Sequence, residues 1–132
     1  MASSRRKRQQ LTVVPEKAEY PQSTGGICQH AMVNEGRSRL AVKVRCSDND
    51  VYRIRPVYSF IEPATAMGLE VSRMPGAPPK EDRLELLYAE VDDDQMNDPR
   101  QPFGRRDVQW PSISICLVGI QELDTLPPAA FD

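Results

Sequence analysis

The sequence has few of the residues on which most enzyme chemistry depends. Its 132 residues include one histidine and three cysteines. Cys28 and His30 therefore have no second pair with which to complete a tetrahedral zinc site. The chain also has no P-loop, dinucleotide-binding fingerprint, Gly-x-Ser-x-Gly elbow or kinase motif. We therefore expect no catalysis, no metal, no cofactor and no small-molecule substrate.

The chain also lacks a long apolar run and a dominant positive charge. No apolar stretch approaches the roughly 18 residues that a membrane-spanning helix needs, and none follows the charged start as a secretory signal requires. The formal net charge of −2 argues against a nucleic-acid-binding domain. An odd number of widely spaced cysteines is typical of a reduced intracellular protein. We expect a cytoplasmic protein, with no membrane insertion and no nucleic acid partner.

Proline, by contrast, is abundant. The chain has 12 prolines in 132 residues, about twice the usual share of roughly 5%. They are spread along the chain and form no repeat. Because proline inside a helix breaks its hydrogen-bonding, this distribution favours many short strands separated by turns.

Two alternating runs joined by a polar break form the clearest pattern. In the first run Leu40, Val42, Val44 and Cys46 face one way, whereas Ala41, Lys43 and Arg45 face the other. After residues 47–50, the second run covers residues 51–55 and stops at Pro56. Side chains alternate across a strand, so each run predicts one apolar face and one wet, basic face.

The rest of the chain continues in the same style. Short strands are predicted at residues 11–14, 27–34, 40–46, 51–55, 68–73, 83–91 and 111–119, and residues 57–61 are apolar enough to cross to the other sheet. Seven short strands separated by turns predict an all-β, immunoglobulin-like antiparallel sandwich. We expect a domain at 11–119, a flexible basic arm at 1–10 and a loosely held tail at 120–132. The sixth strand offers no cysteine to Cys28, so no disulfide is expected.

Three polar motifs have a functional and a plainer interpretation. Arg5–Arg8 fits a nuclear address or a phosphate-binding patch, and equally a solvated arm. Cys28 and His30 share a strand face, which suits a nucleophile with its base, or a half-buried structural histidine. The acidic run 92–98 offers oxygen ligands for calcium but lacks the spacing and glycine of an EF-hand. We favour the plainer interpretation in each case.

Several sequence blocks are informative in combination: Leu40–Ser47, Tyr52–Pro56, Ile61–Pro63, Pro56–Tyr58, Ala77–Asp82 and Leu84–Val91. Together they resemble the major sperm protein (MSP) domain, and among its members the small nematode sperm-specific single-domain proteins. Each block alone is weakly specific, but the combination is quite specific and spans residues 11–119. The basic arm and the last dozen residues lie outside the match.

The resemblance implies a non-enzymatic seven-stranded sandwich that makes protein–protein contacts. One well-known relative assembles into the filaments that drive sperm crawling, so a role in cytoskeletal assembly or its regulation is implied, with a dimer of the chain as one possible assembly. Vesicle-associated relatives use the same domain to bind short acidic peptides that contain two phenylalanines. The alternative function is therefore that of an adaptor for an acidic or phosphorylated peptide.

The candidate partner-binding residues are Lys43, Arg45 and Arg83, on the wet faces of strands that we expect to be neighbours. A convergent set of cations steers and anchors carboxylates or phosphates. Glu85 argues against this ligand, because the peptide-binding relatives have an apolar residue at that place. We expect weak or absent binding of such peptides.

Overall fold

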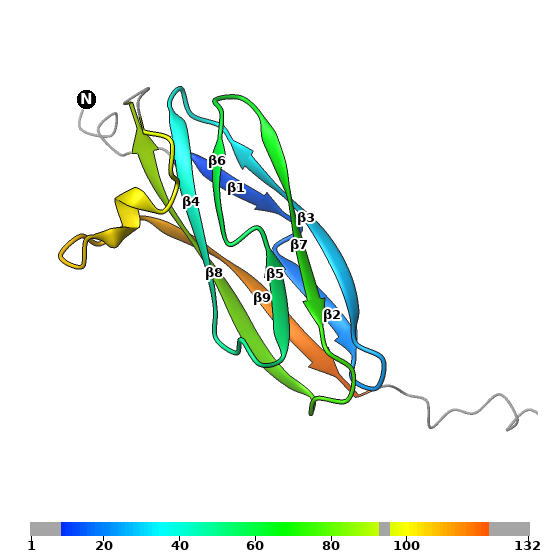
Figure 1. The fold of residues 1–132 in the computed structure, drawn as a ribbon. Helices are drawn as coiled ribbons and strands as arrows, with labels where there is room; N and C mark the ends of the chain where they lie inside the picture. Colours follow the sequence, from blue (N-terminus) through cyan, green and yellow to red (C-terminus); the bar gives the residue numbers. More distant parts are fainter. Residues whose placement is uncertain (1–8, 93–95, 122–132) are drawn as a thin grey trace, which may run out of the picture.

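Two packed β-sheets make up the part of the chain that the computed structural model describes, residues 9–92 and 96–121. The strands are β1 (Leu11–Val14), β2 (Lys17–Pro21), β3 (Gly26–Asn34), β4 (Arg39–Cys46), β5 (Tyr52–Arg55), β6 (Tyr58–Ile61), β7 (Ala66–Arg73), β8 (Lys80–Val91) and β9 (Ser112–Ile120), with the short 3-10 helix η2 (Gln101–Gly104) before β9 (Figure 1). The predicted all-β sandwich is confirmed.

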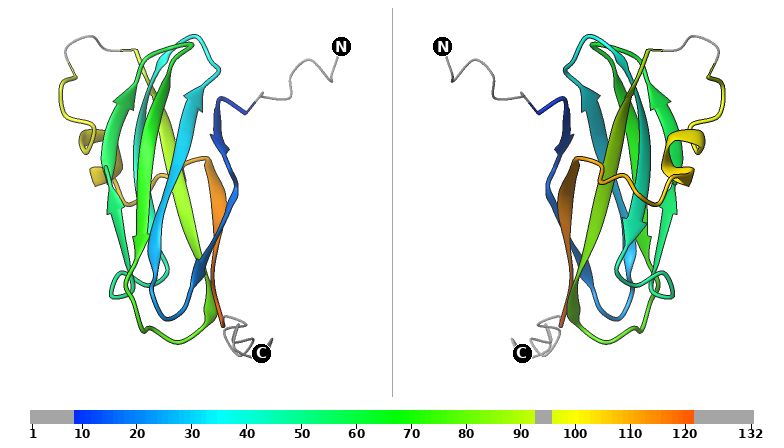
Figure 2. Two further views of the ribbon diagram at one scale, coloured as in Figure 1. Left: turned by 90° about the vertical axis from the view of Figure 1, so that its right-hand side faces the viewer. Right: turned by 90° about the vertical axis from the view of Figure 1, so that its left-hand side faces the viewer.

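One sheet has four strands in the order β1-β3-β7-β5, and the other has five in the order β2-β9-β8-β4-β6. Figure 2 shows the two layers from the side. Every pairing is antiparallel except that of β2 with β9, which is parallel. The two alternating runs of the sequence lie in different sheets, because β4 belongs to the five-stranded sheet and β5 to the four-stranded one.

The structure has nine strands where seven were predicted, because residues 17–21 form the unpredicted strand β2 and residues 57–61, predicted only as a crossing, contain β6. Pro15 separates β1 from β2, and Pro56 separates β5 from β6; both prolines follow cis peptide bonds. Proline has no N–H to give to a ladder, so each break falls where pairing must stop. The predicted crossing by residues 57–61 is confirmed, whereas β2 was not predicted.

The core lies between the sheets and follows the predicted alternation. Leu40, Val42 and Val44 of β4 are buried, and Leu84, Leu86 and Tyr88 of β8 pack in the same cluster. Burying one such aliphatic side chain contributes on the order of 1.5–3 kcal/mol. The three cysteines are free and half-buried, as expected, so among the described residues the sheets are held without a disulfide.

Candidate interaction face

Lys43, Arg45 and Arg83 all lie on the outer face of the five-stranded sheet. Strands β4 and β8 are neighbours, with Lys43 opposite Leu87 and Arg45 opposite Glu85. Arg83 precedes Glu85 by two positions on β8, so it points to the same side. The structure thus places the three predicted cations together; we call this surface the basic face.

A carboxylate of the chain itself neutralises the positive charge at the centre of the basic face. An Arg45 nitrogen lies 2.5 Å from a Glu85 carboxylate oxygen, and the Ser112 hydroxyl donates to the other oxygen over 3.1 Å. The Arg45 guanidinium is the main cause that lowers the pKa of Glu85, although partial burial opposes it. An ionised Glu85 therefore neutralises the positive charge of Arg45, and it repels an incoming carboxylate.

The other two cations have different surroundings. The Lys43 ammonium lies 5.8 Å from the centre of the Tyr58 ring, within cation–π range. Arg83 is exposed and, with Arg45 and Ser47, lines a small cleft of about 210 Å³. A larger cleft of about 560 Å³ on its other side also contains Glu81 and Asp82. The face is therefore mixed in charge.

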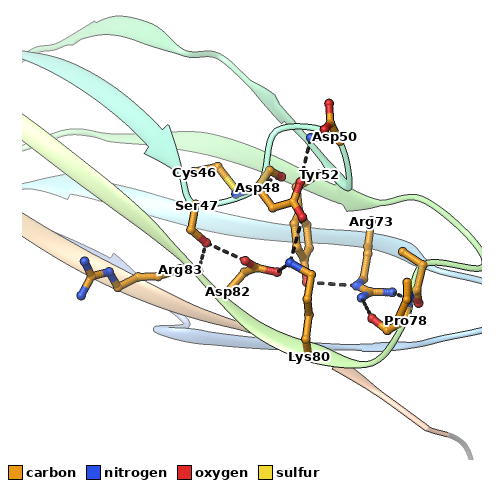
Figure 3. A network of polar contacts seen from close by, with 11 residues as sticks. Cys46, Ser47, Asp48, Asp50, Tyr52, Arg73, Pro78, Lys80, Asp82 and Arg83 are labelled. Atoms are coloured by element: carbon orange, nitrogen blue, oxygen red, sulfur yellow. Dashed lines mark hydrogen bonds and ion pairs between the residues drawn. The ribbon is translucent and has the colours of Figure 1, made fainter.

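A polar network fixes the end of the basic face by joining the turn after β4 to β8 (Figure 3). The Ser47 hydroxyl donates to Asp82 over 2.7 Å and accepts the backbone N–H of Arg83 over 2.9 Å. Lys80 lies between Asp48 at 2.8 Å and Asp82 at 2.5 Å. Its ammonium lowers the pKa of Asp48, and both carboxylates raise the pKa of Lys80. The network holds the Arg83 backbone at a fixed place beside β4.

Arg73 is a buried cation at the same end of the sandwich, only 2% exposed. Its guanidinium donates to the Tyr52 hydroxyl over 3.1 Å and to the carbonyls of Ala77 and Pro78 over 3.0 and 2.6 Å. Sequence reasoning missed this residue. The signal available in the sequence was the alternation of side chains along the strand. Arg73 is two residues beyond the inward-facing Val71, so its side chain also points inward.

The segment between β8 and β9 covers the other half of the outer face. Arg39 donates to the carbonyl of Met96 over 2.9 Å and stacks 4.1 Å from the centre of the Phe60 ring. Beneath this segment Ala41 and Ala89 are buried, although both point outward from the sheet. The segment lies over the face and reaches the edge strand β6.

Three aromatic rings hold this segment in place. Phe103 of η2 lies 6.3 Å from Tyr58 of β6 and 5.6 Å from Trp110, measured between ring centres. Such tilted and edge-on pairs contribute about 0.5–1.5 kcal/mol each beyond their buried area. Trp110 thus packs in this cluster. The segment therefore limits the accessible basic face to the half around Arg45 and Arg83.

The residues that first suggested catalysis or metal binding have surroundings typical of residues with a structural role. His30 is buried, and its Nδ1 lies 2.8 Å from the Pro15 carbonyl, where the proline break occurs; Nε2 is buried without a partner in the described chain. No group of three His, Cys, Asp or Glu side chains that could hold a metal occurs in residues 9–92 and 96–121. The Arg5–Arg8 patch and part of the 92–98 run lie outside the described residues.

The described chain contains no helix with the length and apolarity needed to span a membrane. Most of the predicted arm (1–10) and of the predicted tail (120–132) lies outside the described residues, so the domain limits stay a prediction.

Comparison with known proteins decides the family. The family model for the MSP (major sperm protein) domain matches residues 10–106. The chain belongs to the MSP domain family. Sperm-specific class P proteins 31 and 34 of Caenorhabditis elegans are 46% and 44% identical over 93 residues, which is 70% of this chain and 84% of each relative.

Solved structures of MSP family members have the same fold. WR4 of C. elegans superposes with a TM-score of 0.78 at 38% identity, over 86% of this chain and 100% of its own. SSP-19 of C. elegans gives 0.73 at 28% identity, over 82% and 97%. A PapD-like domain of human CEP192, at 9% identity and a TM-score of 0.62, shares the fold alone. MSP domains are generally non-catalytic structural or interaction modules.

Proposed function

We propose that this MSP-domain protein is a non-enzymatic structural module that acts in sperm cytoskeletal assembly or its regulation by associating with copies of itself. Its relatives are named as sperm-specific proteins, and the family consists of structural and interaction modules. A cytoplasmic location associated with the cytoskeleton belongs to the same proposal. So does the division into a basic arm, a domain at 11–119 and a tail.

The observation that carries this proposal is the ion pair between Arg45 and Glu85 in the middle of the basic face. An adaptor for acidic peptides needs free cations and an apolar pocket at that place. Here the carboxylate of Glu85 occupies it and neutralises Arg45. The pair therefore favours a structural module over an acidic-peptide adaptor.

The opposite face of the sandwich offers further surface for protein contacts. On the four-stranded sheet Val14 and Ile27 are 62% and 66% exposed. A methyl group added to Gly68 would meet no atom within 4 Å, so the sheet is open there. These two side chains are therefore accessible to a partner that packs on this sheet.

Sedimentation velocity over a wide concentration series tests the proposal. The full chain is expected to shift from monomer to larger species as its concentration rises, with addition of sperm extract promoting the shift. A chain that stays monomeric at every concentration, with and without extract, contradicts the proposal.

The second candidate, an adaptor for an acidic or phosphorylated peptide, is favoured by the small cleft between Arg45 and Arg83. A titration with an acidic peptide containing two phenylalanines, in plain and phosphorylated form, separates the two functions. We expect no binding at micromolar concentration by the natural chain. The Glu85→Met variant is expected to gain affinity at least tenfold, and adding Arg45→Glu and Lys43→Glu to it is expected to abolish the gain.

A further inference from the structure

Strand β8 extends beyond its partner β9 and leaves part of its backbone edge open. The pairing with β9 begins where Leu87 lies opposite Ser112, and the Tyr88 N–H donates to the Pro111 carbonyl over 3.0 Å. Strand β8 then continues to Val91. Among the described residues no strand pairs with the Glu90 side of this edge. An open edge of this kind is a template for an added strand.

This open edge forms one wall of a cleft of about 540 Å³. Residues 88–90 of β8 line one side, Gln9 and Gln10 line another, and Trp110 with Pro111 closes the third. The cleft therefore combines backbone hydrogen-bonding groups with the apolar surfaces of an indole and a proline ring. Arginine and lysine side chains suit such a site, because their stems cover apolar surface and their heads stack on aromatic rings.

One carboxylate residue, Glu90, lines the cleft, and others lie near it. Glu90 accepts a hydrogen bond from the Gln10 side chain. Glu35 is held on the other side of Gln10: its N–H donates to the Gln10 carbonyl over 2.7 Å, and its carboxylate accepts from Thr12 over 3.0 Å. Both carboxylate residues are exposed, as is Asp92 just beyond β8. Arg37 and Arg39 lie past Asp92, around a separate cleft. The cleft is thus matched in charge to a basic segment.

The chain itself contains such a segment. Residues 5–8 are four consecutive cations, Arg-Arg-Lys-Arg, in the eight residues that precede the described part. Gln9 and Gln10 already form a wall of the cleft, so the arm that leaves from Gln9 would have to reverse within a few residues to fill it. The arm of another molecule can enter without that reversal.

We propose that the basic arm of a second copy occupies this cleft, pairing with the open edge of β8 and placing its cations against Glu35 and Glu90. This interface deepens the proposed function and rests on it, because it names the surface through which copies associate. Arm and cleft are different surfaces, so the contact is heterologous. A heterologous contact that does not close into a ring produces linear chains of molecules.

Paired charge reversals in the full chain test the interface. One variant reverses the arm (Arg5→Glu, Arg6→Glu, Lys7→Glu and Arg8→Glu), and the other reverses the cleft (Glu35→Arg and Glu90→Arg). Each variant alone is expected to lose self-association at least tenfold at low salt, because like charges then meet. An equimolar mixture is expected to recover it, since each reversed arm then meets a cleft of opposite charge. Circular dichroism and thermal unfolding check that both variants fold.

Sedimentation of the two variants and their mixture gives outcomes that separate this interface from the proposed function. If the natural chain associates and neither reversal weakens it, the arm–cleft interface is wrong and the proposed function stands. If both variants lose association but the mixture does not recover it, the interface is also wrong. If the natural chain is monomeric and its arm is protected from trypsin only when the cleft is intact, the arm binds its own copy and the interface between copies is excluded.

Discussion

Arg73 and Gly119 are fitted to each other: the buried guanidinium of Arg73 occupies the space that a Cβ atom on residue 119 would need. Both residues are the last inward-facing positions of their strands, one in each sheet. The guanidinium cannot simply swing away, because it is held by Tyr52 and by two loop carbonyls. A missing side chain in one sheet thus makes room for a buried cation from the other.

The first prediction concerns this fit. Gly119→Ala forces the guanidinium out of place, and overpacking of this kind costs about 1–3 kcal/mol. Gly68→Ala is the matched control, since it is also a strand glycine but a methyl group there meets nothing within 4 Å. We expect the control to be neutral or slightly stabilising, by up to about 1 kcal/mol. Urea unfolding of the two variants measures both values, and equal destabilisation would contradict the fit.

The second prediction compares two buried tyrosines whose rings meet edge-on, 5.6 Å between centres. Tyr52→Phe removes the acceptor of a buried, charged donor, whereas Tyr20→Phe removes a donor to the neutral carbonyl of Val71. Hydrogen bonds to charged groups are worth about 1.5–3 kcal/mol and neutral ones about 0.5–1.5 kcal/mol. Thermal unfolding should therefore show the larger loss for Tyr52→Phe. The reverse order would mean that Arg73 finds another acceptor.

The third prediction concerns acid stability. The pKa of Glu85 in the folded chain lies below its usual value of 4.5, mainly because of Arg45. Its contribution is therefore present above about pH 4.5 and is lost as the pH falls through the lowered pKa of the folded state. Because the Arg45 side chain is 55% exposed, we expect Glu85→Gln to lower stability at pH 7 by no more than about 1 kcal/mol, and by less at pH 3. The same substitution in an Arg45→Gln background should have a smaller effect at pH 7; an unchanged effect would assign the shift to another group.

The fourth prediction uses the single tryptophan of the chain. Phe103→Ala removes the ring that lies between Tyr58 and Trp110, so the segment over the outer face should loosen. Tryptophan emission is expected to shift to the red and acrylamide quenching to increase, while the unfolding transition of the sandwich persists. Replacement of the exposed Met67 (Met67→Ala) is the control, and it is expected to leave the emission unchanged. Unaltered emission in Phe103→Ala would mean that other contacts hold the segment.

Sequence periodicity predicted the parts of the fold that depend on local pattern. Alternation in β4 and β8 gave their inward faces correctly, and Pro15 and Pro56 marked the breaks. It also put Lys43, Arg45 and Arg83 on the outward faces of their strands. These features are local because a strand shows its two faces within four or five residues.

The features that were missed depend on distant partners. Strand β2 has only Ala18 and Tyr20 as inward residues and gains its place by parallel pairing with β9, about 100 residues away. Arg73 is buried because loop carbonyls turn toward it. The position of Phe103 depends on Tyr58, in a strand that precedes it by more than 40 residues. No local pattern encodes such contacts.

The division of two strands between the sheets has a consequence for how the molecule meets its neighbours. Strands β1, β2, β5 and β6 form the four lateral borders of the two sheets, and each is only four or five residues long. A continuous ribbon running from one molecule to the next needs longer straight borders. Self-association of the kind proposed above would therefore use small, separate contacts, and we expect it to reverse on dilution.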